Sequence, residues 1–223
     1  RGGEILEVAQ HRSGDHRIHI IVDEAYRSLR YEGEDVPSIR SLDLEGQTVI
    51  VAGTFSKSFS PGIRVGWGIL PSHLVEPVLD QKGNIDFGSP YFNQRVMREV
   101  ISSDNYPDHV ETIRESYRQK RDAMLAAADE HFSSIPGVRW HRPCGGLYVW
   151  LELPAGLDSG PGGKLWLSAI DEGMFYVPGQ YCFPSGGPGV RYNYIRLSYG
   201  VQSPERIDEG IAALAQAIRR TLG

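Results

Sequence analysis

A single lysine stands among hydroxyl side chains on a short loop that also carries an arginine. Lys57 follows Thr54 and Ser56, and Arg64 comes later on the same loop. A lysine amine that is partly removed from water is a nucleophile for carbonyl carbons. Hydroxyls and a guanidinium donate hydrogen bonds to an anion with several oxygens, such as a phosphate. These residue types suit a ligand with both an aldehyde and a phosphate, and pyridoxal phosphate is one. Spacing alone is equally compatible with a surface turn whose Lys and Arg are solvated.

An acid and a tyrosine stand upstream, at the end of another expected strand. The stretch 17–22 (RIHIIV) is typical of a strand, and Asp23 and Tyr26 follow it. A carboxylate in this place is able to pair with a pyridine nitrogen and keep it protonated, which makes the ring a better electron sink. The Tyr26 hydroxyl is able to donate to a phenolate oxygen on the same ring. Taken alone, the two residues are better explained as a helix cap and a core tyrosine.

The elements that must position these residues are strands of one sheet. Stretches 48–52 (TVIVA) and 65–69 (VGWGI) flank the lysine loop, and residues 5–9 have helical spacing. Strand and helix in this order are the ingredients of a parallel sheet, in which ligands gather at the carboxyl ends of the strands. Asp23 and the Lys57 loop both fall at such ends, so the sequence predicts one ligand site there.

Four motifs in this order resemble a known family. They are Asp23-x-Ala25-Tyr26, Thr54-x-Ser56-Lys57, Arg64, and the segment 193–199 (NYIRLSY). The sequence is similar to the class I/II aminotransferases of pyridoxal-phosphate fold type I, and most of all to the branch of 2-aminoadipate and kynurenine aminotransferases. Because the four motifs extend over nearly the whole chain, their combination is far more specific than any one of them.

The resemblance implies roles around the cofactor ring. Lys57 is expected to form a Schiff base with pyridoxal phosphate and to move a proton at the substrate's Cα. Asp23 is expected to pair with the pyridine nitrogen, Tyr26 to bond the phenolate oxygen, and Ala25 to pack on one face of the ring. Lys57, Asp23 and Tyr26 are therefore the catalytic candidates.

The resemblance also implies two anion sites. Thr54, Ser56 and Arg64 are expected to bind the cofactor's phosphate, and Arg196 the α-carboxylate of the substrate. The fork of an arginine suits a carboxylate better than a lysine does. By pattern alone, Arg196 is also explained as the solvent-facing member of an alternating strand.

The expected fold is α/β, as the C-terminal part of a fold type I aminotransferase. Residues 1–106 are expected to be the C-terminal part of the large domain that binds pyridoxal phosphate, a mostly parallel sheet with helices. Residues 107–223 are expected to be a smaller α+β domain, with a long helix at 108–132 and strands at 138–141 and 146–153. The second strand alternates Leu147, Val149 and Leu151 with Tyr148, Trp150 and Glu152, which predicts one buried face. A last helix with an apolar stripe is expected to begin at Ser203-Pro204-Glu205. Family members are much longer than this chain, so an N-terminal portion is expected to be absent.

Composition and residue spacing bear on the binding partners and the cellular location that we expect. The net charge of −5 gives no basic field for nucleic acid, and no apolar run approaches the roughly 20 residues of a membrane span. Cys144 and Cys182 form no CxxC pair, which is typical of thiols in a reducing compartment and predicts a cytoplasmic protein. The histidines lack ligand spacing such as HExxH, so no metal is expected. The resemblance implies amino acid and 2-oxo acid substrates and a homodimer.

Two other interpretations stay open. Transcription regulators of the MocR type carry an aminotransferase-like domain behind a DNA-binding helix-turn-helix, and residues 53–57 (GTFSK) are similar to their lysine segment. The Asp-x-Ala-Tyr motif and the Arg196 strand favour the enzyme. A chain without half of the cofactor site is also expected to fold and yet stay catalytically silent, unless a second chain supplies the missing half.

Overall fold

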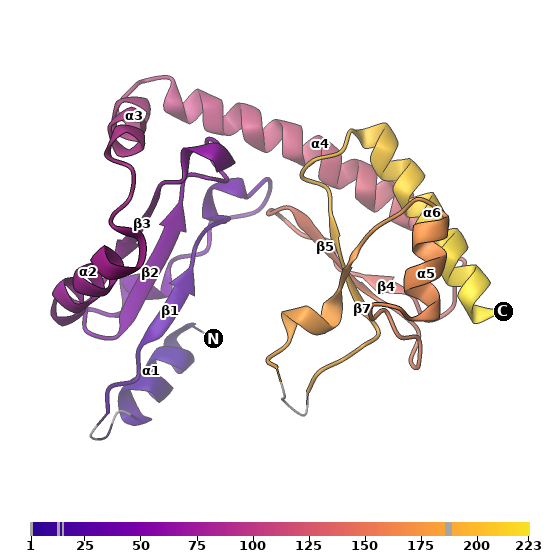
Figure 1. The fold of residues 1–223 in the computed structure, drawn as a ribbon, viewed down its shortest axis with the longest axis horizontal. Coiled ribbons are helices and arrows are strands. Elements are labelled where there is room, and N and C mark those ends of the chain that lie inside the picture. Colours follow the sequence, from indigo (N-terminus) through magenta and orange to yellow (C-terminus); the bar gives the residue numbers. More distant parts are fainter. Residues whose placement is uncertain (1, 13, 15, 186–188) are drawn as a thin grey trace. The chain divides into compact units, whose positions relative to one another are not determined.

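The computed structural model describes residues 2–12, 14, 16–185 and 189–223. The chain divides into two compact units, Arg1–Ile113 and Arg114–Gly223 (Figure 1). The sequence placed a boundary after residue 106, and the division of the structure falls a little later, inside the long helix α4 (Tyr106–Phe132). In the described part of the chain, no helix combines the length and the apolar composition that crossing a membrane requires.

The first unit is built on a three-stranded sheet with the order β1-β2-β3. Its strands are β1 (Ile20–Asp23), β2 (Val49–Thr54) and β3 (Gly66–Ile69). β1 and β2 are parallel, with Asp23 opposite Ala52, and β3 is antiparallel to β2. The parallel pair confirms the expectation that β1 and β2 end at the same edge of the sheet.

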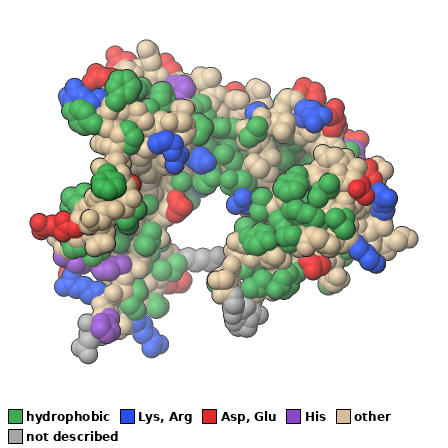
Figure 2. All heavy atoms as spheres, in the orientation of Figure 1, with side chains coloured by type: hydrophobic (Ala, Val, Ile, Leu, Met, Phe, Trp, Pro, Cys, Tyr) green, Lys and Arg blue, Asp and Glu red, His purple; other side chains and the backbone are tan. Residues whose placement is uncertain are grey.

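Helices and short turns complete the first unit. Val49 and Val51 of β2 pack with Leu6 of the first helix, because alternate residues of a strand share one face. The helices are α1 (Gly2–Arg12), α2 (Ser72–Asp86) and α3 (Tyr91–Ile101), and the 3₁₀ turns are η1 (Arg27–Leu29), η2 (Ile39–Leu42) and η3 (Pro61–Ile63). Hydrophobic side chains also reach the surface (Figure 2), among them Ile21 of β1, which is 71% exposed.

A buried aspartate fixes the start of β2. Asp43 is 1% exposed, and its Oδ2 accepts hydrogen bonds from the N–H groups of Thr48 (2.9 Å) and Val49 (2.8 Å). Burial by itself raises the pKa of Asp43, but the bonds from Val49 and Thr48 outweigh it and hold the pKa below its usual value. The carboxylate therefore satisfies two backbone donors just where the central strand begins.

A glycine near the other end of β2 makes room for an indole ring. Gly53 lies opposite Trp67 of β3, and a Cβ on Gly53 would lie 2.3 Å from two ring atoms of Trp67. Carbon atoms in contact are normally about 3.5–4.0 Å apart. Only glycine fits at this point, and the next residue is Thr54, where the lysine loop begins.

The second unit is an antiparallel sheet covered by helices. The strands follow the order β4-β5-β7-β6, and every neighbouring pair is antiparallel. Their bounds are β4 (Arg139–Trp140), β5 (Tyr148–Glu152), β6 (Val177–Pro178) and β7 (Tyr194–Ser198), and the 3₁₀ turn η4 spans Gly179–Cys182. The expected alternation in β5 is confirmed, since Val149 and Leu151 are buried whereas Tyr148 and Trp150 are partly exposed.

The helices of the second unit cover one face of this sheet. They are α5 (Lys164–Asp171), α6 (Pro204–Leu222) and the C-terminal part of α4, and α5 packs against α6 (Figure 1). Ser203 caps the start of α6, since its Oγ accepts from Arg206 N (3.4 Å), and Pro204 lies in the first turn of the helix. Its buried stripe contains Ile207, Ile211, Leu214, Ala215, Ala217 and Ile218.

Candidate active site

Asp23 ends β1, and the chain turns immediately after it. Asp23 Oδ1 accepts from Ala25 N (3.0 Å), and Glu24 N donates to Ala52 O (2.8 Å) on the neighbouring strand. These two bonds hold the carboxylate at the carboxyl end of the parallel pair. Asp23 is exposed, and among the described residues it forms no ion pair.

The lysine loop leaves the end of β2 and folds back on itself. Thr54 Oγ1 accepts from Ser56 N (3.0 Å), and Phe55 N donates to Val65 O (3.1 Å), which closes the loop at its base. Ser56 and Lys57 are partly buried, as expected for residues that follow a buried strand directly. Lys57 therefore lies on a closed loop at the carboxyl end of β2.

Two contacts from later helices hold the outer part of the loop. Ser58 is 3% exposed, and its Oγ lies 3.0 Å from the hydroxyl oxygen of Tyr106 at the start of α4. Asn93 of α3 donates from Nδ2 to Ile63 O (2.9 Å). The loop is therefore fixed by side chains that lie far along the sequence.

Arg64 ends the loop in an unusual backbone conformation. Its φ is 52° and its ψ is 37°, in the left-handed region that residues other than glycine seldom adopt. Its Nη1 donates to Pro61 O (3.1 Å) and more weakly to Ser56 Oγ (3.5 Å). The backbone cost of this conformation is about 1–2 kcal/mol. The loop tolerates this cost and places the guanidinium beside Ser56.

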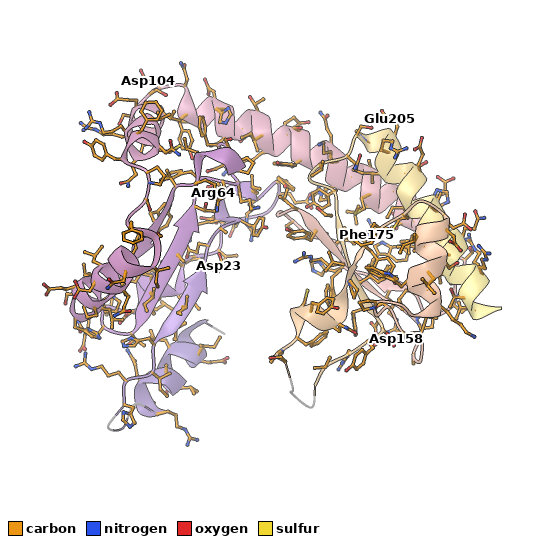
Figure 3. All side chains as sticks on the ribbon, in the orientation of Figure 1. Asp23, Arg64, Asp104, Asp158, Phe175 and Glu205 are labelled. Atoms are coloured by element: carbon orange, nitrogen blue, oxygen red, sulfur yellow. The ribbon has the colours of Figure 1, made fainter. Side chains whose placement is uncertain are left out.

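Tyr26 connects the two strand ends. The Nζ of Lys57 lies 5.5 Å from the centre of the Tyr26 ring, within the range of a cation–π contact. Tyr26 comes from the turn after β1 and Lys57 from the loop after β2. The structure therefore brings the turn after β1 to the lysine loop, and Figure 3 shows Asp23 at the carboxyl end of β1 and Arg64 on the loop that follows β2.

Unpaired charges of both signs characterise this edge of the sheet. Within the described ranges, Asp23, Lys57 and Arg64 have no oppositely charged partner within ion-pair distance. A cationic fork with neighbouring hydroxyls suits a phosphate, an amine suits an aldehyde, and a carboxylate suits a protonated ring nitrogen. The donor set therefore fits the three functional groups of pyridoxal phosphate.

Arg196 belongs to the second unit. It lies on β7, opposite Trp150 of β5 and Val177 of β6. The guanidinium carbon lies 4.5 Å from the centre of the Tyr148 ring. Its Nε is buried and has no hydrogen-bond partner among the described residues. The side chain is thus stacked and partly buried, unlike the simple solvent-facing arginine that the alternation also allowed.

Three supporting residues were missed by sequence reasoning. Ser58 contacts Tyr106, and Asn93 binds Ile63 O, so both hold the loop that carries Lys57 and Arg64. Tyr148 contacts Arg196 across the second sheet. The alternation of β5 placed Tyr148 on the face opposite Leu147, but pairing it with Arg196 requires the register between β5 and β7. No local signal marks Asn93 or the burial of Ser58.

One group of possible metal ligands lies elsewhere. In the described part of the chain, Glu130, His131 and Asp208 have ligand atoms within 4.8 Å of one another. Both carboxylates are exposed, and His131 Nε2 lies 3.4 Å from Asp208 Oδ1, so the pair joins α4 to α6. This arrangement is explained by contact between the two helices.

Comparison with known protein families gives one match, to aminotransferase class I and II, over residues 4–214. Aromatic-amino-acid aminotransferase 1 of Thermococcus litoralis is 37% identical over 91% of this chain and 46% of its own length. The HTH-type transcriptional regulator YdfD of Bacillus subtilis is 32% identical over 98% of this chain and 42% of its own length.

A solved structure supports the same relationship. The α-aminoadipate aminotransferase of Thermus thermophilus, complexed with N-(5'-phosphopyridoxyl)-L-leucine, superposes with a TM-score of 0.87 at 32% identity. The match covers 99% of this chain and 54% of that chain. The expected fold is confirmed by this similarity. The chain spans about half the length of the curated relatives that it matches.

Proposed function

Because the chain belongs to the class I and II aminotransferases, we propose that it carries the lysine site of an aminotransferase that uses pyridoxal phosphate. The reaction moves an amino group between an L-α-amino acid and a 2-oxo acid. The observation that carries this proposal is the set of unpaired charges at the carboxyl edge of β1 and β2, where Asp23, Lys57 and Arg64 meet no opposite charge in the described residues. Bound pyridoxal phosphate supplies an electron sink that weakens the Cα–H bond of an amino acid.

The residues after β1 bind and tune the cofactor ring. Asp23 pairs with the ring nitrogen and keeps it protonated, since a carboxylate that is free of other cations is available for it. Tyr26 donates to the phenolate oxygen, and Ala25 packs on the ring. The hydrogen bond from Ala25 N to Asp23 Oδ1 orients the carboxylate for this task.

The residues after β2 bind the phosphate. Thr54, Ser56 and Arg64 offer two hydroxyls and a guanidinium, and the contact between Arg64 Nη1 and Ser56 Oγ supports a shared ligand. The left-handed backbone at Arg64 is a strain of the kind that gathers at ligand sites.

Lys57 would hold the aldehyde carbon of the cofactor through Nζ, and its free amine would act as the general base that takes the proton from the substrate's Cα. In the second unit, Arg196 binds the substrate's α-carboxylate. The first unit is then the C-terminal part of the large cofactor-binding domain, and the second unit is the small C-terminal domain.

A turnover assay with the complete protein tests the proposal. The protein is loaded with pyridoxal phosphate and given a panel of L-amino acids with a 2-oxo acid acceptor. Changing Lys57→Ala is expected to lower turnover by more than about 10³-fold. Lys82→Ala is the matched control, because Lys82 is a partly exposed lysine on α2 that pairs with Asp86. Undiminished turnover by the Lys57→Ala variant would make the mechanism wrong.

A second candidate function has an observation in its favour. The regulator YdfD aligns with 98% of this chain, so the same fold would serve as the ligand-binding domain of a MocR-type regulator. We expect such a domain to bind pyridoxal phosphate and to release no 2-oxo acid. The same assay separates the two functions, since the regulator shows cofactor absorbance without turnover.

The remaining features of the proposal concern the cellular setting. We place the protein in the cytoplasm, because Cys144 and Cys182 are exposed free thiols. A homodimer is supported by apolar side chains exposed on α2 and α3, among them Leu79 and Phe92. If the 223-residue chain is tested alone, we expect it to stay silent without a second chain that completes the cofactor site.

A further inference from the structure

Two aromatic rings lie beside Arg196 on the same face of the second sheet. In the antiparallel ladder of β5 and β7, Trp150 is directly opposite Arg196, and Tyr148 is opposite Ser198. Tyr148 is thus the diagonal neighbour of Arg196 on that face, within reach of a long side chain. Register alone does not decide which ring holds the guanidinium.

The ring geometry decides between them. Trp150 stacks on Tyr194, with ring centres 5.4 Å apart and planes 17° from parallel. The guanidinium carbon of Arg196 instead lies 4.5 Å from the centre of the Tyr148 ring. Tyr148 is therefore the aromatic partner of Arg196, and Trp150 packs in the other direction along the strand.

Stacking on a ring fixes an arginine without using its donors. The attraction acts through the face of the guanidinium, whereas its five N–H groups lie in its plane. A carboxylate is bound through those in-plane groups, as two parallel hydrogen bonds. The ring therefore orients the fork and leaves it open for the ligand. Nε of Arg196 is buried and has no hydrogen-bond partner in the described residues, so the described part of the chain does not already use this donor.

The residues before Tyr148 hold it on a rigid element. The Tyr199 hydroxyl donates to Gly146 O (2.8 Å), and Tyr199 N donates to Leu147 O (3.1 Å). Tyr199 is fully buried. The start of β5 is thus anchored to the end of β7, which sets the position of Tyr148 relative to Arg196.

We propose that Tyr148 is a positioning residue whose ring holds the Arg196 guanidinium in the orientation that receives the substrate's α-carboxylate. The inference rests on the proposed function, because it takes the carboxylate-binding role of Arg196 from it. Amino acid and 2-oxo acid both carry that carboxylate, so Tyr148 acts on the binding of both substrates and not on the proton transfer at Cα.

The test compares variants with and without the ring in the complete protein loaded with pyridoxal phosphate. Tyr148→Leu and Tyr148→Met remove the ring, and Tyr148→Phe keeps it. The ring-less variants are expected to raise the KM of the amino acid and of the 2-oxo acid by about fivefold to tenfold. Their kcat is expected to stay within about twofold of the wild type, and Tyr148→Phe is expected to match the wild type in both constants. Two ring-less variants are used so that a folding defect in one leaves the other.

The control variants separate this inference from the proposed function. Tyr192→Leu makes the same chemical change at an exposed tyrosine of the same unit and is expected to leave both KM values unchanged. Arg196→Ala is expected to raise both KM values more than any Tyr148 variant.

If Arg196→Ala raises KM and the ring-less variants do not, the inference about Tyr148 is wrong and the role of Arg196 stands. If Arg196→Ala leaves KM unchanged, the role of Arg196 is wrong and the inference falls with it. A fall in kcat at constant KM in the ring-less variants would also contradict positioning.

Discussion

Gly53 offers the sharpest test of how the sheet positions the lysine loop. In Gly53→Ala, the new Cβ would lie 2.3 Å from two atoms of the Trp67 ring. Ordinary contact is about 3.5–4.0 Å, so the ring or the strand must move by about 1 Å or more. Such overpacking costs about 1–3 kcal/mol of the free energy of unfolding. Because Thr54 follows directly, the same displacement is expected to weaken the binding of pyridoxal phosphate.

Gly62, on the lysine loop, provides the control substitution. A Cβ on Gly62 would meet only Ser60 Oγ, at 3.7 Å, which is ordinary contact. Gly62→Ala is therefore expected to leave stability unchanged or to raise it by about 0.5 kcal/mol, because alanine restricts the unfolded chain. Urea denaturation followed by circular dichroism measures stability, and cofactor absorbance measures the affinity for pyridoxal phosphate.

A double variant identifies the clash as the cause. In Gly53→Ala/Trp67→Ala the obstructing ring is gone, so the cost of the alanine is expected to fall by about 1–3 kcal/mol relative to Gly53→Ala alone. Equal midpoints for Gly53→Ala and Gly62→Ala would refute the reasoning. A double variant in which the two changes are additive would refute it as well, because the cost would then not come from the indole.

Three further predictions concern charged and buried groups. The pKa of Asp43 is lower in the folded state, so its contribution to stability is present above the unfolded pKa and is lost as pH falls through the folded pKa. Asp43→Ala is expected to cost about 1–3 kcal/mol of the free energy of unfolding at neutral pH. In urea titrations, the same variant is expected to lose this dependence of stability on acid pH. Burial raises the pKa of Tyr176, and the negative charge of Asp158 raises it further. The free energy of unfolding is therefore expected to fall as pH rises above about 10, and Tyr176→Phe is expected to abolish that fall. Asp23→Asn is expected to lower turnover by about 10²-fold while the cofactor still binds, as measured by activity and absorbance on the same samples.

The fold follows from the sequence where periodicity is strong. α4 and α6 were predicted from long amphipathic stretches, and the expected alternation of β5 is observed. Strand limits were less well predicted. A strand was expected from residue 17, yet β1 starts at Ile20, because Ile20 N donates to Thr48 O and pairing with β2 begins only there. A strand end is set by its partner, which local pattern does not contain.

The sequence predicted which residues form the candidate site better than it predicted how their side chains are arranged. Asp23 and Lys57 were placed at the carboxyl ends of two strands by pattern, and β1 and β2 end at one edge of the sheet. The left-handed backbone of Arg64 was not predicted, because an arginine carries no signal for a positive φ. The stacking of Arg196 on Tyr148 was not predicted either, since it depends on the register between β5 and β7. Local residue types indicate chemistry, whereas orientation is set by contacts between distant segments.

Borohydride reduction and peptide mass mapping test the central claim most directly. Pyridoxal phosphate is added to the complete protein, the bond to its lysine is reduced, and the modified peptide is identified. The 223 residues contain four lysines, Lys57, Lys82, Lys120 and Lys164, so the outcome is unambiguous within this chain. We expect the label on Lys57, together with loss of the label in Lys57→Ala. Label spread over the other three lysines, or unchanged labelling after Lys57→Ala, would contradict the assignment of the cofactor site.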